Sequence, residues 1–227
     1  MKKLVVICLG LILLQSCDNT GLAIFNTVFC GCNEEEIALY EAVERGDLGA
    51  LRAYLEGGGE PTLKCYADVG RSDGFWDYLY YKVALSNSTE MVKYYIGFNL
   101  PQKIKDDLLG AFVNKQNTEL TRLLVDSDAH RFRNADGCLQ SYYEEILKEY
   151  ELLVDVGYDF NWQNDDGNTL LMLYSKCWAD DSSEKLITIL QFLVDHGAKT
   201  DIKNNDGKTA YDVAVNPKVK AFLAQYE

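Results

Sequence analysis

Apolar residues recur along this chain with the spacing of amphipathic helices, and several of the apolar stretches end at a glycine. The closing positions are 57, 97, 127, 157 and 197, so they follow one another at intervals of 40, 30, 30 and 40 residues. A repeat of about 33 residues with two insertions explains these intervals and predicts successive helical hairpins. The predicted units span residues 34–58, 73–98, 102–127, 136–157, 166–197 and 206–227.

The chain also aligns with itself, without gaps, where one predicted unit passes into the next. Residues 157–169 (GYDFNWQNDDGNT) match residues 197–209 (GAKTDIKNNDGKT), and residues 127–139 match both. Gly157 and Gly197 suit the left-handed residue that ends a helix. The Asp-Gly pair in each of these two segments suits a tight turn with positive φ, and the threonine two residues later can cap the next helix.

These features resemble the ankyrin repeat: its closing glycine, its N-x-D-G-x-T turn and the paired apolar residues of its second helix. The resemblance covers residues 35–227 and is strongest from residue 127 onwards. It implies an all-α fold, a solenoid of about six helix-turn-helix units joined by short β-hairpin-like turns, with the last unit as a C-terminal cap. The T-P-L-H motif of the family is incomplete throughout, and residues 57–74 form an expanded, glycine-rich connection.

The N-terminus has the pattern of an export signal. Lys2 and Lys3 precede an apolar run, Leu4–Leu14, which is too short to span a bilayer because a spanning helix needs about 20 residues. The run ends in the sequence Leu-Gln-Ser-Cys, which resembles the lipobox of bacterial lipoproteins. That resemblance implies cleavage before Cys17 and attachment of diacylglycerol to its thiol. The alternative is an ordinary secretory signal followed by a chance cysteine.

The predicted organisation is therefore a signal peptide over residues 1–16, a lipidated cysteine and tether over 17–33, and an ankyrin-repeat domain over 34–227. Asp18 resembles the residue that retains lipoproteins in the inner membrane of enteric bacteria. The predicted location is the inner membrane, with the chain facing the periplasm, and the outer membrane is the alternative.

Charge and composition exclude some classes of partner. The formal net charge is −13, and loss of Lys2 and Lys3 with the signal peptide changes it to −15. Phosphate binding requires a basic surface, so we expect no nucleic acid partner. The acidic charge instead favours solubility and the attraction of a basic protein surface.

We find no sequence motif for catalysis, and we expect no enzyme activity, no cofactor, no metal and no small-molecule substrate. The chain lacks the Gly-x-Ser-x-Gly elbow, the phosphate loop and the HExxH zinc motif. His196 precedes the closing glycine of a repeat, and His130 lies where two repeats join, so both have a structural explanation. Asp180, Asp181 and Glu184 lack the spaced loop of a calcium site and favour a solvated acidic loop.

Five cysteines follow Cys17, and export would allow them to be oxidised. Cys30 and Cys32 are candidates for a disulfide with Cys65, because all three belong to the N-terminal part. Cys138 and Cys177 belong to neighbouring repeats and are a second candidate pair. An odd number leaves at least one thiol free unless it pairs between chains.

Three groups of residues are candidates for binding a protein partner, since aromatic residues dominate interface hot spots. The first is the bulky residue five positions after a closing residue, and the second is the aromatic segment 75–81. The third is the insertion after residue 177. The candidates are Phe132 and Trp162, with Ile202 at the matching position; Trp76 and Tyr78; and Trp178, Asp180 and Asp181. The alternative for the first group is that its side chains cover adjacent helices.

A lipid-anchored, acidic, ankyrin-like binder resembles the lipoproteins encoded beside toxic effectors of type VI secretion systems, many of which are phospholipases. The resemblance implies an immunity protein that binds a cognate toxin at the periplasmic face, with a lipase as a candidate partner. The alternative is a housekeeping or stress-related scaffold that binds an endogenous envelope protein.

Replacement of Cys17 tests the membrane anchor. We expect Cys17→Ala to abolish palmitate labelling and to release the chain from membrane fractions, because two acyl chains or more give stable anchoring. The measurement is metabolic labelling followed by fractionation. Labelling that persists in the variant contradicts lipidation at this residue.

Overall fold

The computed structural model describes residues 33–67, 75–130, 143–177 and 183–226, and of residues 65–67, 75–77 and 183 it describes only the backbone. The chain divides into two compact units, residues 1–104 and 105–227. No helix in the described ranges is long and apolar enough to cross a membrane. The helical repeat architecture predicted from the sequence is confirmed by the helix pairs described below.

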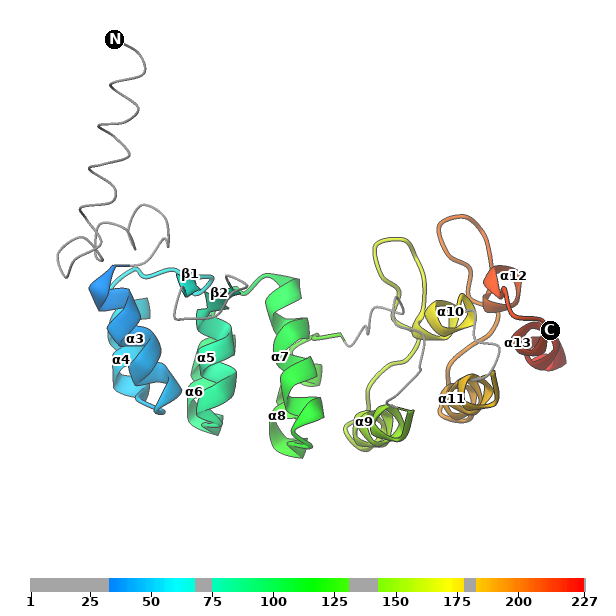
Figure 1. Cartoon of the computed structure of the whole chain (residues 1–227), viewed down its shortest axis with the longest axis horizontal. Coiled ribbons are helices and arrows are strands. Elements are labelled where there is room, and N and C mark those ends of the chain that lie inside the picture. Colours follow the sequence, from blue (N-terminus) through cyan, green and yellow to red (C-terminus); the bar gives the residue numbers. More distant parts are fainter. Residues whose placement is uncertain (1–32, 68–74, 131–142, 178–182, 227) are drawn as a thin grey trace, which may run out of the picture. The chain divides into compact units, whose positions relative to one another are not determined.

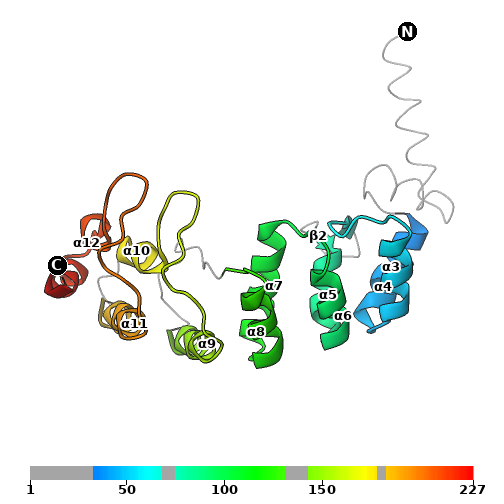
Figure 2. The ribbon, with the colours of Figure 1, turned by 180° about the vertical axis from the view of Figure 1, so that it is seen from behind.

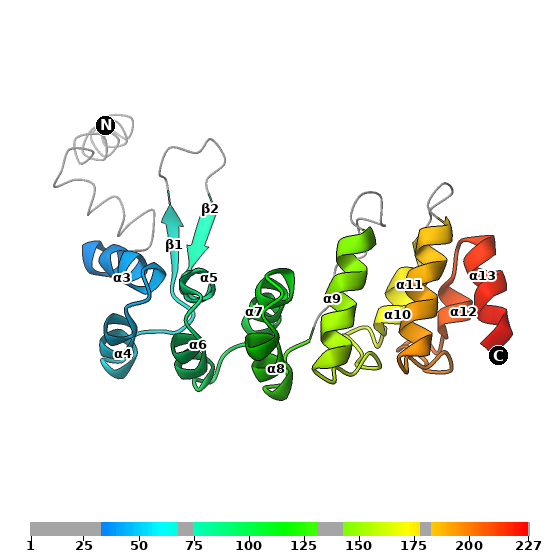
Figure 3. The same ribbon diagram turned by 90° about the horizontal axis from the view of Figure 1, so that it is seen from below.

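The first unit contains two helical hairpins in two layers (Figures 1 and 3). Helices α3 and α5 pack side by side, and α4 and α6 form the second layer beneath them. Lys82 of α5 donates to Glu44 of α3 over 2.8 Å, and Arg52 of α4 lies 4.6 Å from the ring centroid of Tyr94 in α6. The helices are α3 (Glu34–Glu44), α4 (Leu48–Glu56), α5 (Leu79–Ser86) and α6 (Thr89–Ile96).

Each hairpin of this unit turns through a left-handed residue followed by a capping side chain. Gly46 has φ +88° and Asn87 has φ +52°. The next residue in each case, Asp47 or Ser88, accepts a hydrogen bond from an amide in the first turn of the following helix. Such a cap satisfies one of the otherwise unpaired amides of the helix. The turn therefore ends one helix and begins the next within two or three residues.

A short antiparallel strand pair lies in the connection between the two hairpins. Strands β1 (Lys64–Ala67) and β2 (Phe75–Tyr78) pair with Lys64 opposite Tyr78, and Figure 3 shows them projecting beyond α5. The second predicted repeat, residues 73–98, does not enter its first helix at once, because β2 occupies residues 75–78 and α5 begins at Leu79. The hydroxyls of Tyr40 and Tyr95 donate to the backbone carbonyls of Leu63 and Pro61, and so hold the connection against α3 and α6.

The second unit continues the helix pairs. It contains most of α7 (Gln102–Asn114), α8 (Thr118–Asp126), α9 (Tyr143–Asp155), α10 (Leu170–Ser175), α11 (Ser183–Asp195), α12 (Ala210–Val213) and α13 (Pro217–Leu223), which a 3₁₀ turn follows over Ala224–Tyr226. Helices α10 and α12 pack together in one layer, and α11 and α13 pack in the other (Figures 1 and 2). Between α7 and α8, Gln116 has φ +55° and Asn117 is the cap, so this hairpin repeats the turn of the first unit.

The closing positions of the repeats agree with the prediction in part. Gly157 and Gly197 have φ +79° and +93°, as predicted for left-handed helix ends. Gly97 closes α6 as its C-cap, as predicted, but with φ −67° it does so in a right-handed conformation, unlike Gly157 and Gly197. At the first closing position the left-handed residue is Gly58, one residue later than predicted, and near residue 127 it is Asp128.

Two long turns before α10 and α12 are built around matching asparagines. The Oδ1 atom of Asn164 accepts from two backbone amides over 3.1 and 2.8 Å, and that of Asn204 does so over 3.1 and 3.0 Å. Gly167 and Gly207 have φ +76° and +75°, which confirms the predicted Asp-Gly turns. The threonines that follow cap α10 and α12, also as predicted.

Hydrogen bonds join these two turns to one another along their length. Asn205 donates to the carbonyl oxygens of Asp165 and Asp166 from its side chain and its backbone. The buried side chain of Asn204 donates to Asn168 over 3.0 Å, and Asn161 bonds to the neighbouring turn at Gly197 and Lys199. The approach is so close that a Cβ on Gly167 would lie 2.7 Å from the backbone nitrogen of Asn205.

Aromatic side chains tie these turns to the helices. Tyr150 of α9 is buried, and its ring contacts Phe160 before the turn, Tyr174 of α10 and Phe192 of α11. Its hydroxyl lies 2.6 Å from that of Tyr174. Aromatic edge contacts of this kind contribute about 0.5–1.5 kcal/mol each beyond the area they bury.

Helix α13 ends the described array with a polar outer side, as predicted for a C-terminal cap. Val219, Phe222 and Leu223 are buried, whereas Lys218 and Lys220 are exposed. A terminal repeat needs such a polar face because no further repeat covers it.

The two turn glycines provide a matched test of the contact between repeats. Gly207→Ala should cost about 1 kcal/mol, because only the positive φ opposes an alanine there and no atom lies within 4 Å of the added Cβ. Gly167→Ala should cost clearly more, on the order of 2–4 kcal/mol, because the Cβ also meets the backbone of Asn205. Urea unfolding of both variants measures the difference, and equal losses would contradict close stacking of the turns.

Candidate protein-binding surface

Helix α5 exposes two large apolar side chains on one side. Tyr81 is 51% exposed and Leu85 is 38% exposed. They are four residues apart, so they lie one above the other on the helix. Leu79, Val83 and Ala84 of the same helix are buried. We call the exposed pair the Tyr81–Leu85 patch, and most large apolar side chains in the described ranges are less exposed.

Acidic side chains of α3 are close to the helix that carries this patch. Helix α3 contains Glu34, Glu35, Glu36, Glu41 and Glu44, and it packs against α5. Lys82 lies between the two patch residues in the sequence and is engaged by Glu44, so its positive charge is compensated within the chain. Exposed pairs such as Glu41–Arg45, at 3.6 Å, contribute little to stability. The arrangement offers an apolar contact beside negative charge.

Tyr78, a predicted binding residue, lies at the beginning of α5. It is half-buried, and its ring packs against Tyr80 with 5.2 Å between centroids. The backbone of Trp76 lies in β2, but its side chain is outside the description. The sequence indicated an aromatic concentration here but did not identify Leu85, because the start of α5 at Leu79 decides which residues face outward.

Trp162, another candidate in the described ranges, packs its ring against that of His130. The two rings stack with 3.9 Å between centroids and 13° between planes. The His130 side chain is 11% exposed, and its Nε2 lies 3.2 Å from Asp128, while its backbone amide donates to Asp106. Trp162 is half-buried. The stack gives Trp162 a structural part in joining repeats, which was the alternative weighed for it, and leaves part of its surface open.

The remaining predicted sites fall outside the part of the chain that is described. These residues are Cys17, Asp18, Cys30, Cys32, Phe132, Cys138, Trp178, Asp180 and Asp181. Of Cys65 only the backbone is described. Cys177 is buried and disulfide-bonded, as expected of an oxidised pair, and its predicted partner Cys138 is among the residues not described.

The shifted pKa values of Tyr95 and Asp212 each have a structural cause. Burial raises the pKa of Tyr95, whose hydroxyl donates to the Pro61 carbonyl. Hydrogen bonds from the backbone and side chain of Thr209 lower the pKa of Asp212, which forms the capping box of α12.

His196 stacks on Phe192 and bonds to its carbonyl through Nδ1 over 2.7 Å. In the described ranges no group of three or more potential metal ligands occurs.

Among solved structures, the chain is similar to several ankyrin repeat proteins. No protein-family model and no curated protein matches the chain. The ankyrin repeat protein EF0377 shares 20% identity over 84% of this chain and 98% of its own, with a TM-score of 0.44. The human ASB11 ankyrin repeat domain shares 19% over 84% and 82%, with a TM-score of 0.40. The ankyrin repeat domain of Bcl-3, a member of the IkappaB family, shares 16% over 82% and 97%, with a TM-score of 0.36.

The assignment of repeats therefore depends on features of this chain and not on its likeness to these structures. Its helix pairs, its matching asparagine turns and its threonine caps are the features that define the repeat.

Proposed function

We propose that this chain binds a protein partner and that the Tyr81–Leu85 patch is part of the binding surface. The exposure of two large apolar residues on one side of α5 is the observation that carries the proposal. Large side chains that contribute to binding lie in the centre of an interface, where the partner excludes water around them. Tyr81 is half exposed, whereas Leu79, Val83 and Ala84 of the same helix are buried.

The charge of the chain indicates the chemistry of the partner. Helix α3 is acidic beside the patch, and the whole chain carries a net charge of −13. A partner that presents basic residues around an apolar centre would complement both features. Complementary charge increases the rate of association and makes it dependent on salt.

Our finer proposal is that the chain is an immunity lipoprotein that neutralises a secreted antibacterial toxin at the periplasmic face. The support is the lipobox at Cys17, the acidic charge and a repeat array that offers a surface for proteins. The mechanism would be steric: the array covers the catalytic cleft or the membrane-docking surface of the toxin. A membrane anchor would raise the local concentration of inhibitor where the toxin arrives.

A competition experiment tests the immunity role. A strain that lacks this chain should be killed by its toxin-delivering parent, and the wild-type gene should restore survival. If the deletion strain competes equally with a parent proven to deliver its toxins, immunity is wrong and the scaffold role becomes the better proposal.

Binding measurements on patch variants test the site. We expect Tyr81→Ala and Leu85→Ala each to weaken binding by at least tenfold, about 1.4 kcal/mol, to the toxin against which the chain protects. Val215→Ala is the matched control, because Val215 is 49% exposed in the other unit. Circular dichroism first establishes that all three variants are folded. Normal binding by the folded patch variants would contradict the site but leave the immunity role standing.

A further inference from the structure

One lysine of α5 is bonded to the acidic helix beside the Tyr81–Leu85 patch. The Nζ atom of Lys82 donates to the Oε2 atom of Glu44 in α3 over 2.8 Å. The side chain of Lys82 is 16% exposed, whereas that of Glu44 is 47% exposed. The lysine is therefore largely enclosed by the chain, and the carboxylate that it engages is open to a partner.

This ion pair lies at the edge of the patch. Lys82 precedes Leu85 by three residues, so their side chains are neighbours on the same side of α5. Tyr81 is about 100° from Lys82 around the helix. A partner that covers the two apolar side chains consequently comes close to Glu44.

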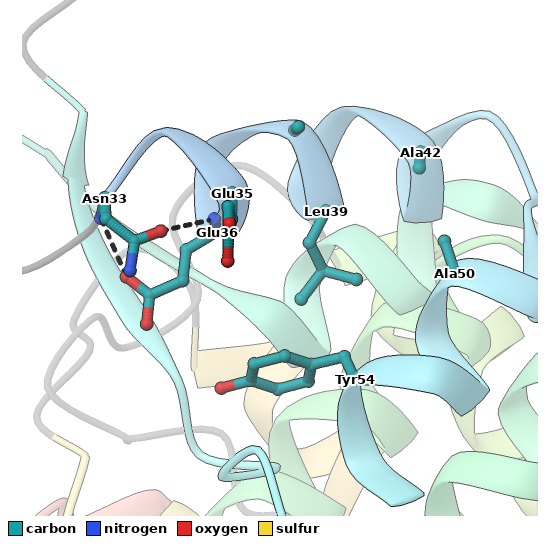
Figure 4. Close-up of a pocket in the computed structure, with 8 residues that line it drawn as sticks. Asn33, Glu35, Glu36, Leu39, Ala42, Ala50 and Tyr54 are labelled. Carbon is teal, nitrogen blue, oxygen red and sulfur yellow. Dashed lines mark hydrogen bonds between the residues drawn. The ribbon is translucent and has the colours of Figure 1, made fainter. Parts of the chain in front are cut away.

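Two other carboxylates of α3 make their contacts within that helix or at its cap. Glu36 accepts from the Asn33 amide over 2.8 Å in the capping box, and Figure 4 shows it at the groove between α3 and α4. Glu41 pairs with Arg45 over 3.6 Å. Glu44 differs from both, because its ion pair reaches the helix that carries the patch.

We propose that Glu44 is the anchor for an arginine of the partner and that Lys82 occupies this position in the free chain. The inference rests on the proposed binding function of the patch. Lys82 bonds to one carboxylate oxygen, whereas a guanidinium group can bond to both oxygens of a carboxylate in parallel. An arginine of the partner therefore adds a contact that Lys82 does not make.

Competition with Lys82 selects arginine over lysine in the partner. Because Lys82 belongs to the same chain, its effective concentration at Glu44 is far higher than that of a separate molecule. A lysine of the partner offers the same ammonium group and gains no contact over Lys82. An arginine gains the second parallel bond. Lys82 thus discriminates against partners whose basic residue is a lysine.

Peptide binding to the folded full-length chain tests the inference. The probe is a synthetic helical peptide with leucine and arginine one turn apart, and its control peptide has lysine in place of arginine. We expect the wild-type chain to bind the arginine peptide at least tenfold more tightly than the lysine peptide. Lys82→Met, which keeps a long apolar side chain, should tighten binding of the lysine peptide at least tenfold and that of the arginine peptide less, because Glu44 is then unoccupied.

Arg45→Met is the matched control for the loss of charge. It removes one positive charge from the same unit and releases Glu41, whose ion pair does not reach α5. A general increase in negative charge would tighten binding equally in both variants, whereas competition at Glu44 tightens it in Lys82→Met alone. Equal tightening in the two variants, or no tightening in Lys82→Met, overturns the proposal.

Two further variants separate the anchor from the patch. Glu44→Gln should abolish the preference for the arginine peptide, and Tyr81→Ala should weaken both peptides at least tenfold. If Tyr81→Ala weakens binding but Glu44→Gln keeps the preference, the patch stands and the anchor is wrong. If the wild-type chain binds neither peptide, or if Tyr81→Ala changes nothing, the anchor and the patch are both wrong.

Discussion

The side-chain oxygens of two asparagines hold the repeats around α10 and α12 in register. Asn164 and Asn204 each bind two backbone amides of their own turn, and the amide group of Asn204 reaches across to Asn168 of the preceding turn. A turn without strand partners would otherwise leave these amides to water. Because the turns are fixed, the threonine caps of α10 and α12 begin each helix at a defined point, and the two helices can pack.

This local chemistry explains why the repeats could be predicted from the sequence. The Asp-Gly turns, the threonine caps and the glycine helix ends at 157 and 197 depend on residues within a few positions of one another. Other helix ends do not follow from residue type in this way. Gly97 could adopt a left-handed φ, but it remains right-handed, and Gln116 is left-handed although its residue type gives no signal for it.

The candidate surface was harder to predict for a different reason. Pairing of β1 with β2 takes Phe75–Tyr78 out of the helix, so α5 begins at Leu79 and its exposed side carries Tyr81 and Leu85. A shift of two residues in that start would have exposed other side chains. The sequence left open whether Trp162 binds a partner or packs within the chain, and its ring stacks on His130 from a different repeat. Contacts between residues 32 positions apart have no local sequence signal.

The same distinction applies to function. Repeated turns and caps make a regular support, and the residues that support does not need are the ones available for binding. On α5 these are the two patch residues, beside the acidic helix α3. They suit a partner with a basic and apolar surface.

The most direct test of this account is amide exchange in the asparagine turns, measured by NMR. The amides of Asp166, Asn168, Asp206 and Lys208 donate to the asparagine oxygens, although three of these four residues have exposed surfaces. The account predicts that all four exchange at least tenfold more slowly than the amide of Asp165, an exposed residue of the Asn164 turn. Equal, fast exchange at all five positions would contradict the claim that these asparagines hold the repeats in register.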